Sequence, residues 1–391
     1  MKVGILTRKD EHKWGGDLKA LYSFYDALKD VDQDVIIAPT IEELAHADFI
    51  FLANTSFSLK EPYAYVKKIG KPYGVIPFHC DRDKYYSSCY GFAHFVGCCL
   101  YQPDALPFYS LDQLLEDPEI IQFFPYVHSS MFEENLPVLD NANLCIATSQ
   151  AEARIIQRDS PNAHVEIIPL ECGIPDSFLE RTDSSFLEWT GLKKGEYVLQ
   201  VGRIELRKNQ LGSILAMRDL EMPLVFIATQ SFYPHYVQLC FDAIRKCRKA
   251  PTLIISQEHQ DCEEGAFRIL QMPQQRKLPM EMLISAYQNA GLYIHPAFCE
   301  MPGLIYLEAA KLGLPIVASK WTTISDYFPK PCDQFLYTQP HHIQAITAAI
   351  QHQFSKRFSK FPHPIFSRTK ADVGRELVSA LHRSLDIYFK R

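Results

Sequence analysis

The chain has 391 residues, of which 47% are hydrophobic and 22% are charged, and this composition is typical of a globular protein. Because this length exceeds that of one ordinary core, two domains are expected. The net charge of −6 provides no basic surface for nucleic acid, and no motif of a nucleic-acid-binding module is visible.

The cysteines and the hydropathy of the chain indicate the cellular compartment of the protein. The eleven cysteines are scattered without the paired spacing of a metal site, so we expect free, buried thiols in a reducing compartment. No apolar run reaches the 18 residues that a membrane-spanning helix requires. The N-terminus runs directly into a strand pattern and carries no signal peptide. Together these features predict a cytoplasmic protein.

Short apolar runs alternate with helical patterns along most of the chain, which predicts an α/β protein with parallel sheets. A polar stretch at 181–185 separates two such series, so we expect two successive open α/β domains with ligands at the carboxyl ends of the strands. The predicted strands are 3–7, 35–38, 49–52, 73–78, 144–147, 165–168, 197–201, 224–228, 252–255, 292–295 and 316–318. The predicted helices are 17–28, 111–124, 150–158 and 369–389.

Two glycines, Gly15 and Gly16, follow the first predicted strand and open a helix. Without a Cβ they let backbone N–H groups approach a phosphate or a sugar closely. A plain turn is the alternative interpretation. The chain has no Gly-x-Gly-x-x-Gly motif, which disfavours a dinucleotide-binding fold.

Basic residues follow the predicted strand 197–201, in the segment Gly202-Arg203-Ile-Glu-Leu-Arg207-Lys208. Cations at the carboxyl end of a strand can neutralise a phosphate, and arginine can do so bidentately. A solvated helix start is the alternative, although cations there oppose the helix dipole. Within this segment Arg207 is the weaker candidate, since a surface charge also accounts for it.

The end of the predicted strand 73–78 carries further polar residues. His79 could hydrogen-bond a substrate hydroxyl there, and a purely structural histidine is an equal alternative. Asp81 and Asp83 have the spacing of a metal-binding carboxylate pair, or they belong to a surface charge cluster.

Two other segments have less specific patterns. Eight aromatic residues crowd 84–109, where they could stack on sugars or enter a membrane interface, but core packing under a long connection is the favoured interpretation. The basic stretch 356–360 is interpreted as a solvated linker, with peripheral contact to an anionic membrane as the alternative.

Two carboxylates, Glu300 and Glu308, flank an otherwise apolar segment. Pro302 suits the first position of a helix that stops before Gly313. Glu300 then precedes the helix start, and Glu308 lies about 9 Å further along at ~1.5 Å per residue. The N–H groups of a helix start suit an anion, and carboxylates accept hydroxyl protons. A phosphate between two sugar rings would suit this segment, because the phosphate would bind the N–H groups and the sugar hydroxyls would bind the carboxylates.

These motifs together resemble the retaining GT-B glycosyltransferases of family four. Glu300 and Glu308 are separated by seven residues, Pro302-Gly303 lie between them, and Gly202-Arg203-x-x-x-x-Lys208 lies upstream. The resemblance covers the C-terminal half strongly, and the N-terminal half only through Gly15-Gly16 and His79.

The resemblance implies the GT-B fold, in which two Rossmann-like open parallel-sheet domains face a cleft. It implies an N-terminal, acceptor-side domain over 1–172 and a nucleotide-sugar-binding domain over 173–370. It further implies a C-terminal helix over 371–391 that crosses back to the N-terminal domain. The segment Cys172-Gly173-Ile174-Pro175 is similar to the interdomain crossing of these enzymes.

The resemblance also implies roles for individual residues. Glu300 would bind the donor sugar and support charge at its reacting face, and Glu308 would hold the ribose of the nucleotide. Arg203 and Lys208 would grip the diphosphate as it leaves, and His79 would touch the donor sugar. The further donor contacts that it implies are Gly15, Gly16, Pro302, Gly303 and Leu304.

The sequence therefore predicts a retaining glycosyltransferase that moves a hexosyl- or N-acetylhexosaminyl-type sugar from a nucleotide-diphospho-sugar to an acceptor hydroxyl. No cofactor and no metal is expected, because the cations would meet the charge on the leaving diphosphate. The acceptor, whether a glycan, lipid, protein or small molecule, is not identified. A GT-B nucleotide-sugar epimerase and a non-catalytic sugar-binding protein remain the alternatives.

Overall fold

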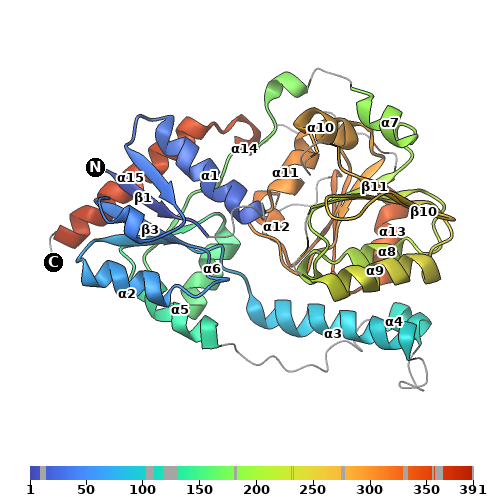
Figure 1. The fold of residues 1–391 in the computed structure, drawn as a ribbon, viewed down its shortest axis with the longest axis horizontal. Coiled ribbons are helices and arrows are strands. Elements are labelled where there is room, and N and C mark those ends of the chain that lie inside the picture. Colours follow the sequence, from blue (N-terminus) through green and yellow to red (C-terminus); the bar gives the residue numbers. More distant parts are fainter. Residues whose placement is uncertain are drawn as a thin grey trace.

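A computed structural model of the chain shows two lobes side by side, each built on one open sheet (Figure 1). The structure describes residues 1–8, 15–102, 110–117, 130–179, 183–229, 231, 233–273, 278–328, 333–354, 356 and 364–389. Among the helices of these ranges, none is long and apolar enough to cross a membrane. The ten cysteines that are described are free thiols, as expected.

The N-terminal lobe contains a six-stranded sheet with the strand order β2-β1-β3-β4-β5-β6. All its neighbouring strands are parallel. Its strands β1, β4 and β5 are buried at every position, as expected where helices cover both faces of a parallel sheet. The bounds are β1 (Val3–Leu6), β2 (Val35–Ala38), β3 (Phe49–Ala53), β4 (Tyr73–Ile76), β5 (Leu144–Ala147) and β6 (Val165–Ile167).

The C-terminal lobe contains an eight-stranded sheet with the order β10-β11-β9-β8-β7-β12-β13-β14. Only the pairing of β10 with β11 is antiparallel among the described strands of this sheet. The bounds are β7 (Val198–Val201), β8 (Leu224–Ala228), β9 (Thr252–Ser256), β10 (Cys262–Glu264), β11 (Phe267–Gln271), β12 (Leu292–His295), β13 (Ile316–Ser319) and β14 (Phe335–Thr338).

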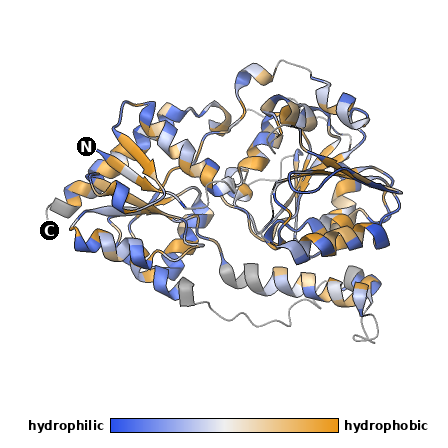
Figure 2. Cartoon of the chain, viewed as in Figure 1, coloured by the Kyte–Doolittle hydropathy of each residue, from blue (hydrophilic) through white to orange (hydrophobic). Residues whose placement is uncertain are grey.

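Helices pack around both sheets, and Figure 2 shows apolar residues gathered on the strands between them. The helices are α1 (Gly16–Lys29), α2 (Lys60–Lys68), α3 (Arg82–Tyr101), α4 (Leu111–Glu116), α5 (Ser130–Asp140), α6 (Gln150–Asp159), α7 (Ser185–Thr190), α8 (Gln210–Ala216), α9 (Pro234–Cys247), α10 (Met280–Asn289), α11 (Leu304–Lys311), α12 (Ile324–Tyr327), α13 (Ile343–Gln353), α14 (Pro364–Ser367) and α15 (Lys370–Phe389). Short 3-10 helices are η1 (Glu42–Leu44), η4 (Asp176–Phe178) and η5 (Leu206–Lys208).

The predicted α/β fold class is confirmed, and each of the eleven predicted strands overlaps an observed one. Three strands were not predicted, namely β10, β11 and β14. The predicted helix 111–124 is observed as α4 and stops at Asp117, which has extended backbone angles. The part of that prediction from 118 onward lies outside the described residues.

The last helix, α15, returns to the N-terminal lobe and packs along α1, as the GT-B resemblance implied (Figure 1). Lys370 Nζ lies 2.8 Å from Asp26 Oδ2, and the Ser384 hydroxyl donates to the Asn143 carbonyl oxygen at 3.1 Å. A Cβ on Gly374 would lie 2.1 Å from the Ala27 carbonyl oxygen, so only glycine permits this close helix contact.

The described part of the aromatic segment is helical and is not the long connection that we expected. Its first part forms α3, which leaves the N-terminal lobe after β4 and lies along the C-terminal lobe, beside α9 (Figure 1). Phe92 and Phe95 are buried in the core of the C-terminal lobe, whereas Tyr90 and Tyr101 are exposed. Core packing is therefore confirmed for the two phenylalanines. The aromatic residues at 108 and 109 lie outside the described residues.

Replacement of Phe92 by alanine should lower the free energy of unfolding by about 3–5 kcal/mol, the usual cost of truncating a buried phenylalanine. The centre of its ring lies 5.8 Å from that of the Phe298 ring, so this contact packs α3 against the C-terminal lobe. Tyr90→Ala, on the exposed side of the same helix, is the control and should cost far less. Equal denaturation midpoints for the two variants would show that α3 is not part of this core.

Candidate active site

Two segments of the C-terminal lobe meet at the carboxyl ends of adjacent strands. One follows β7 and contains η5, and the other follows β12 and leads into α11. The N–H of Phe298 donates to the Arg207 carbonyl oxygen at 2.8 Å, which ties the two segments together. Because parallel strands bring their carboxyl ends to one edge, residues about 90 positions apart in sequence converge here.

Glu300 is the centre of this convergence. Its Oε2 atom lies 2.5 Å from Lys208 Nζ and 3.2 Å from Arg207 Nη1, and the residue is 6% exposed. Burial alone would raise the pKa of Glu300, but the charges of Lys208 and Arg207 outweigh it and hold the pKa well below its usual range. Glu300 is therefore an anion at neutral pH.

A buried histidine, His295, lies next to the Glu300 carboxylate. Burial lowers the pKa of His295 to about 4, and the carboxylate of Glu300 offsets this only in part. The Gln200 amide nitrogen donates to His295 Nδ1 at 3.3 Å, which places the ring proton on Nε2. That atom lies 3.5 Å from Glu300 Oε2. His295 is thus a neutral group whose Nε2 atom lies beside the carboxylate, at a distance too long for a well-formed hydrogen bond.

Both arginines of the segment after β7 share a second carboxylate, Glu205. Arg207 Nη2 lies 2.7 Å from Glu205 Oε1, and Arg203 Nε lies 3.6 Å from Glu205 Oε2. Glu205 is only 4% exposed, so it helps to hold the two guanidinium groups in place. We ranked Arg207 below Arg203 and Lys208, yet the structure places it between Glu205 and Glu300.

The N-terminal lobe faces these groups with its glycine loop. A Cβ on Gly15 would lie 3.3 Å from Arg203 Cζ and 2.7 Å from Asp17 Oδ1, so the missing side chain allows the two lobes to approach. Between the lobes is a cavity of about 280 Å³, which we call the cleft cavity. Its lining includes Arg8, Gly16, Arg203, Arg207 and Glu300. Gly16 and Arg203 thus line the same cavity from opposite lobes.

Glu308 lies on α11 and is 3% exposed. Lys19, on α1 of the opposite lobe, forms an ion pair with its Oε1 atom, and the Tyr287 hydroxyl donates to Oε2 at 3.4 Å. The Glu308 charge raises the pKa of Lys19. Gly173 in the interdomain crossing passes beside this pair, where an added Cβ would lie 3.2 Å from Lys19 Nζ. Glu308 does not line the cleft cavity itself.

The start of α11 differs from our expectation at one residue. Pro302 is not its first helical residue, because Gly303 is the N-cap and Leu304 begins the helix. Gly303 has a φ of +74°, a left-handed conformation that favours glycine. Thr323 holds this turn through its hydroxyl, which donates to the carbonyl oxygens of Glu300 and Pro302 at 3.3 Å each.

His79 does not line the cleft cavity; it lies in the interior of the N-terminal lobe with 1% exposure. Its Nε2 atom lies 2.9 Å from Asp159 Oδ2, and its Nδ1 atom lies 3.0 Å from the Thr55 hydroxyl. Both ring nitrogens are therefore engaged within the lobe, and the structural alternative fits this geometry. The neighbours Phe78 and Cys80 line the cavity instead.

The carboxylate pair at 81 and 83 has no metal-site geometry in the described residues. Asp81 Oδ2 lies 3.2 Å from Arg158 Nη1, and the side chain of Asp83 is outside the described set. No group of three or more His, Cys, Asp or Glu residues that could hold a metal ion occurs in the part of the chain that the structure describes.

Solved structures resemble the chain over nearly its whole length. Sucrose-phosphate synthase from Thermosynechococcus elongatus matches with a TM-score of 0.59 and 14% identity, over 99% of this chain and 97% of that one. HepE from Anabaena, in complex with UDP and glucose, matches with a TM-score of 0.58 and 13% identity, over 98% and 99%. The chain has the GT-B fold. At such identities the GT-B likeness concerns the fold alone.

A third GT-B structure, the lipopolysaccharide outer core galactosyltransferase WaaB, matches with a TM-score of 0.55 and 10% identity, over 98% of this chain and 99% of that one. By sequence, the chain is similar to the O-antigen chain mannosyltransferase B of Escherichia coli, with 27% identity over 233 residues. That match covers 58% of this chain and 54% of the relative, so the chain spans about half the length of the relative. No family model matches the chain.

Proposed function

We propose that the protein is a glycosyltransferase that moves a sugar from a nucleotide-diphospho-sugar to an acceptor hydroxyl. One observation carries the proposal: Arg207 and Lys208 converge on Glu300, with Arg203 beside them, at the cavity between the two lobes of a GT-B fold. The mannosyltransferase relative and the UDP bound by HepE support it, and they make UDP-sugars the first donors to test.

In this proposal the cations act on the leaving group. As the bond to the sugar breaks, negative charge builds on the diphosphate, and preorganised donors in a buried site stabilise such charge strongly. Arg203 and Arg207 are held by Glu205, so an entering diphosphate competes with that carboxylate for both guanidinium groups. Lys208 is buried behind Glu300; burial lowers the pKa of its ammonium group, and the Glu300 carboxylate opposes this shift.

Glu300 acts on the sugar side of the breaking bond. Its low pKa keeps it anionic, so it supports the positive charge that develops on the sugar ring and accepts bonds from sugar hydroxyls. We assign the N–H groups at Gly303 and Leu304, with the Gly15-Gly16 loop, to the phosphates. His79 is assigned a structural role in the N-terminal lobe, through Asp159 and Thr55, and not a contact with the sugar.

The finer part of the proposal is a hexosyl- or N-acetylhexosaminyl-type transfer with retention and without a metal. Thermal-shift screening of nucleotide sugars selects the donor, because a bound ligand stabilises the folded state. Proton NMR of the first product should then show the anomeric configuration of the donor, and EDTA should leave the rate unchanged. An inverted signal would refute retention. Conversion of the donor to a free epimer would favour the nucleotide-sugar epimerase. Donor binding without turnover would favour the non-catalytic sugar-binding protein.

Glu308→Gln should weaken nucleotide binding by roughly 1–3 kcal/mol, the range for a lost hydrogen bond to a charged group. The proposed cause is loss of the charged acceptor for the ribose hydroxyls, while glutamine keeps the shape. Calorimetric titration with the selected nucleotide measures it. Glu281→Gln on the exposed side of α10 is the control, and an unchanged affinity in Glu308→Gln would place the ribose elsewhere.

A further inference from the structure

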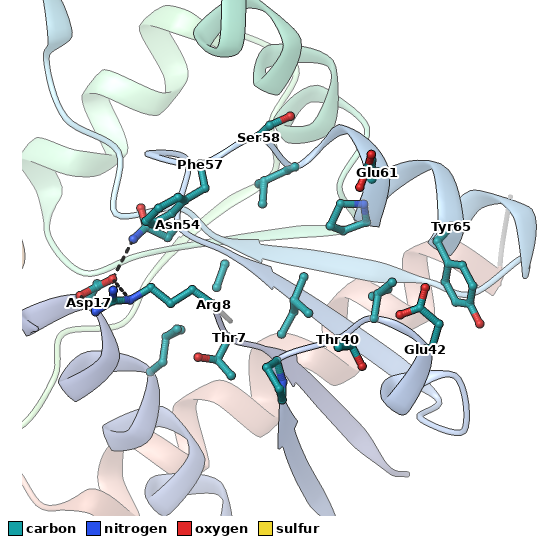
Figure 3. Close-up of a pocket in the computed structure, with 17 residues that line it drawn as sticks. Thr7, Arg8, Asp17, Thr40, Glu42, Asn54, Phe57, Ser58, Glu61 and Tyr65 are labelled. Atoms are coloured by element: carbon teal, nitrogen blue, oxygen red, sulfur yellow. Dashed lines mark hydrogen bonds and ion pairs between the residues drawn. The ribbon is translucent and has the colours of Figure 1, made fainter. Parts of the chain in front are cut away.

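The N-terminal lobe contains a second and larger cavity, of about 420 Å³, at the carboxyl ends of β1 and β3 (Figure 3). We call it the N-terminal chamber. Four residues line both this chamber and the cleft cavity, namely Arg8, Asp17, Asn54 and Phe57. The two spaces therefore adjoin, with these four residues between them.

The shared end of the chamber is polar but locally neutral. Arg8 Nε lies 3.1 Å from Asp17 Oδ2, and the Asn54 amide nitrogen donates to the same oxygen at 3.1 Å (Figure 3). Because Asp17 compensates the charge of Arg8, this end offers hydrogen bonds without an excess positive charge for an anion.

The other end of the chamber is acidic. Glu42 on η1 and Glu61 on α2 line it, together with Thr40 and Tyr65 (Figure 3). Both carboxylates are exposed, and neither has an ion-pair partner among the described residues. The described lining thus has one arginine against three carboxylates, so the net charge of these described residues is negative.

A polar group in the chamber wall points to a polar occupant. Thr7 is 6% exposed, and its hydroxyl has no hydrogen-bond partner among the residues that the structure describes. A buried hydroxyl without a partner costs free energy, and native structures seldom keep one without a reason. Apolar side chains such as Leu59 and Phe57 complete the wall, as in sites that bind the faces of sugar rings.

We propose that the N-terminal chamber binds the acceptor and selects uncharged or amine-bearing sugars over those that carry a phosphate or a carboxylate; this rests on the proposed function. Carboxylates accept hydrogen bonds from sugar hydroxyls and pair with an ammonium group. A phosphate near Glu42 and Glu61 would meet like charge with no spare cation in the described lining to offset it.

Saturation-transfer NMR in the presence of UDP tests this selection without any need for turnover. The uncharged probes are the methyl α-glycosides of glucose, galactose and mannose, the amine probe is glucosamine, and the anionic probe is glucose 6-phosphate. We expect a saturation-transfer NMR signal from glucosamine and from at least one methyl glycoside. The signal from glucose 6-phosphate should be at least tenfold weaker.

The double variant Glu42→Lys/Glu61→Lys should reverse the preference between glucosamine and glucose 6-phosphate. Both positions are exposed, so the variant should fold. Glu133→Lys on α5, an exposed charge reversal outside the chamber, should keep the wild-type preference. Three results would each overturn the inference. They are an equally strong NMR signal from glucose 6-phosphate in the wild type, no signal from any uncharged probe, and an unchanged preference in the double variant. Calorimetric titration with UDP measures the donor site separately. Loss of UDP binding would count against the proposed function, whereas UDP binding with a failed probe test would count against the chamber alone.

Discussion

Arg203→Ala and Lys208→Ala should each slow sugar transfer by a factor on the order of 10² or more, as expected when a donor to the transition-state charge is removed. Arg203 lines the cleft cavity, and Lys208 adds its buried charge through Glu300. Because both act on the diphosphate, binding of the free nucleoside should hardly change. The comparison of kcat with nucleoside affinity therefore separates a leaving-group role from a general loss of the site.

Arg218→Ala is the matched control for these variants. Arg218 also lies on the C-terminal lobe and pairs with two carboxylates, Asp112 and Asp219, but those carboxylates are mostly exposed and lie away from the cleft cavity. It should transfer at close to the wild-type rate. Near wild-type turnover in both Arg203→Ala and Lys208→Ala would make the phosphate assignment wrong.

Local sequence patterns were sufficient for those parts of the fold that depend on neighbours in the chain. Apolar runs with turns at their ends located the strands, and Gly313 located the end of α11. The two motif segments could be placed together because parallel strands carry their following residues to one edge of the sheet. The GT-B resemblance assigned Arg203, Lys208 and Glu300 to one site, and their roles there remain predictions.

The remaining contacts of the site depend on tertiary packing that no local pattern contains. His295 on β12 meets Gln200 on β7, and a buried histidine inside a strand has no distinguishing local signal. Lys19 meets Glu308 only because α1 lies across the cleft from α11. Likewise, the partners of His79 come from α6 and from the loop after β3, so its structural role was invisible from its own segment.

The chamber of the N-terminal lobe was equally hidden from sequence reasoning. Its lining comes from the ends of β1 and β3, from α1, and from the elements η1 and α2 that follow β2 and β3. Each of its polar residues is ordinary in its own segment. Only the assembled sheet shows that Arg8 is neutralised by Asp17 while Glu42 and Glu61 are not neutralised within the described residues.

Glu300→Gln should abolish most transfer, by a factor on the order of 10² or more, while the donor still binds. Glutamine keeps the shape and one acceptor oxygen, but it removes the anion that two cations hold in place beside a buried histidine. The positive charge on the reacting sugar then loses its support. The rate is measured with saturating donor, and donor affinity is measured by calorimetry.

The same substitution leaves Lys208 buried beside a neutral group, and loss of one partner of a buried pair is destabilising by about 3–5 kcal/mol. Thermal denaturation must therefore show that Glu300→Gln is folded at the assay temperature. The Lys208→Met/Glu300→Gln double variant removes the unpaired charge and should recover stability without recovering transfer, because the sugar-facing anion and the Lys208 charge are then both missing. Recovery of the rate along with stability would mean that neither Glu300 nor Lys208 acts in the reaction itself. Wild-type transfer by the folded single variant would remove Glu300 from the mechanism.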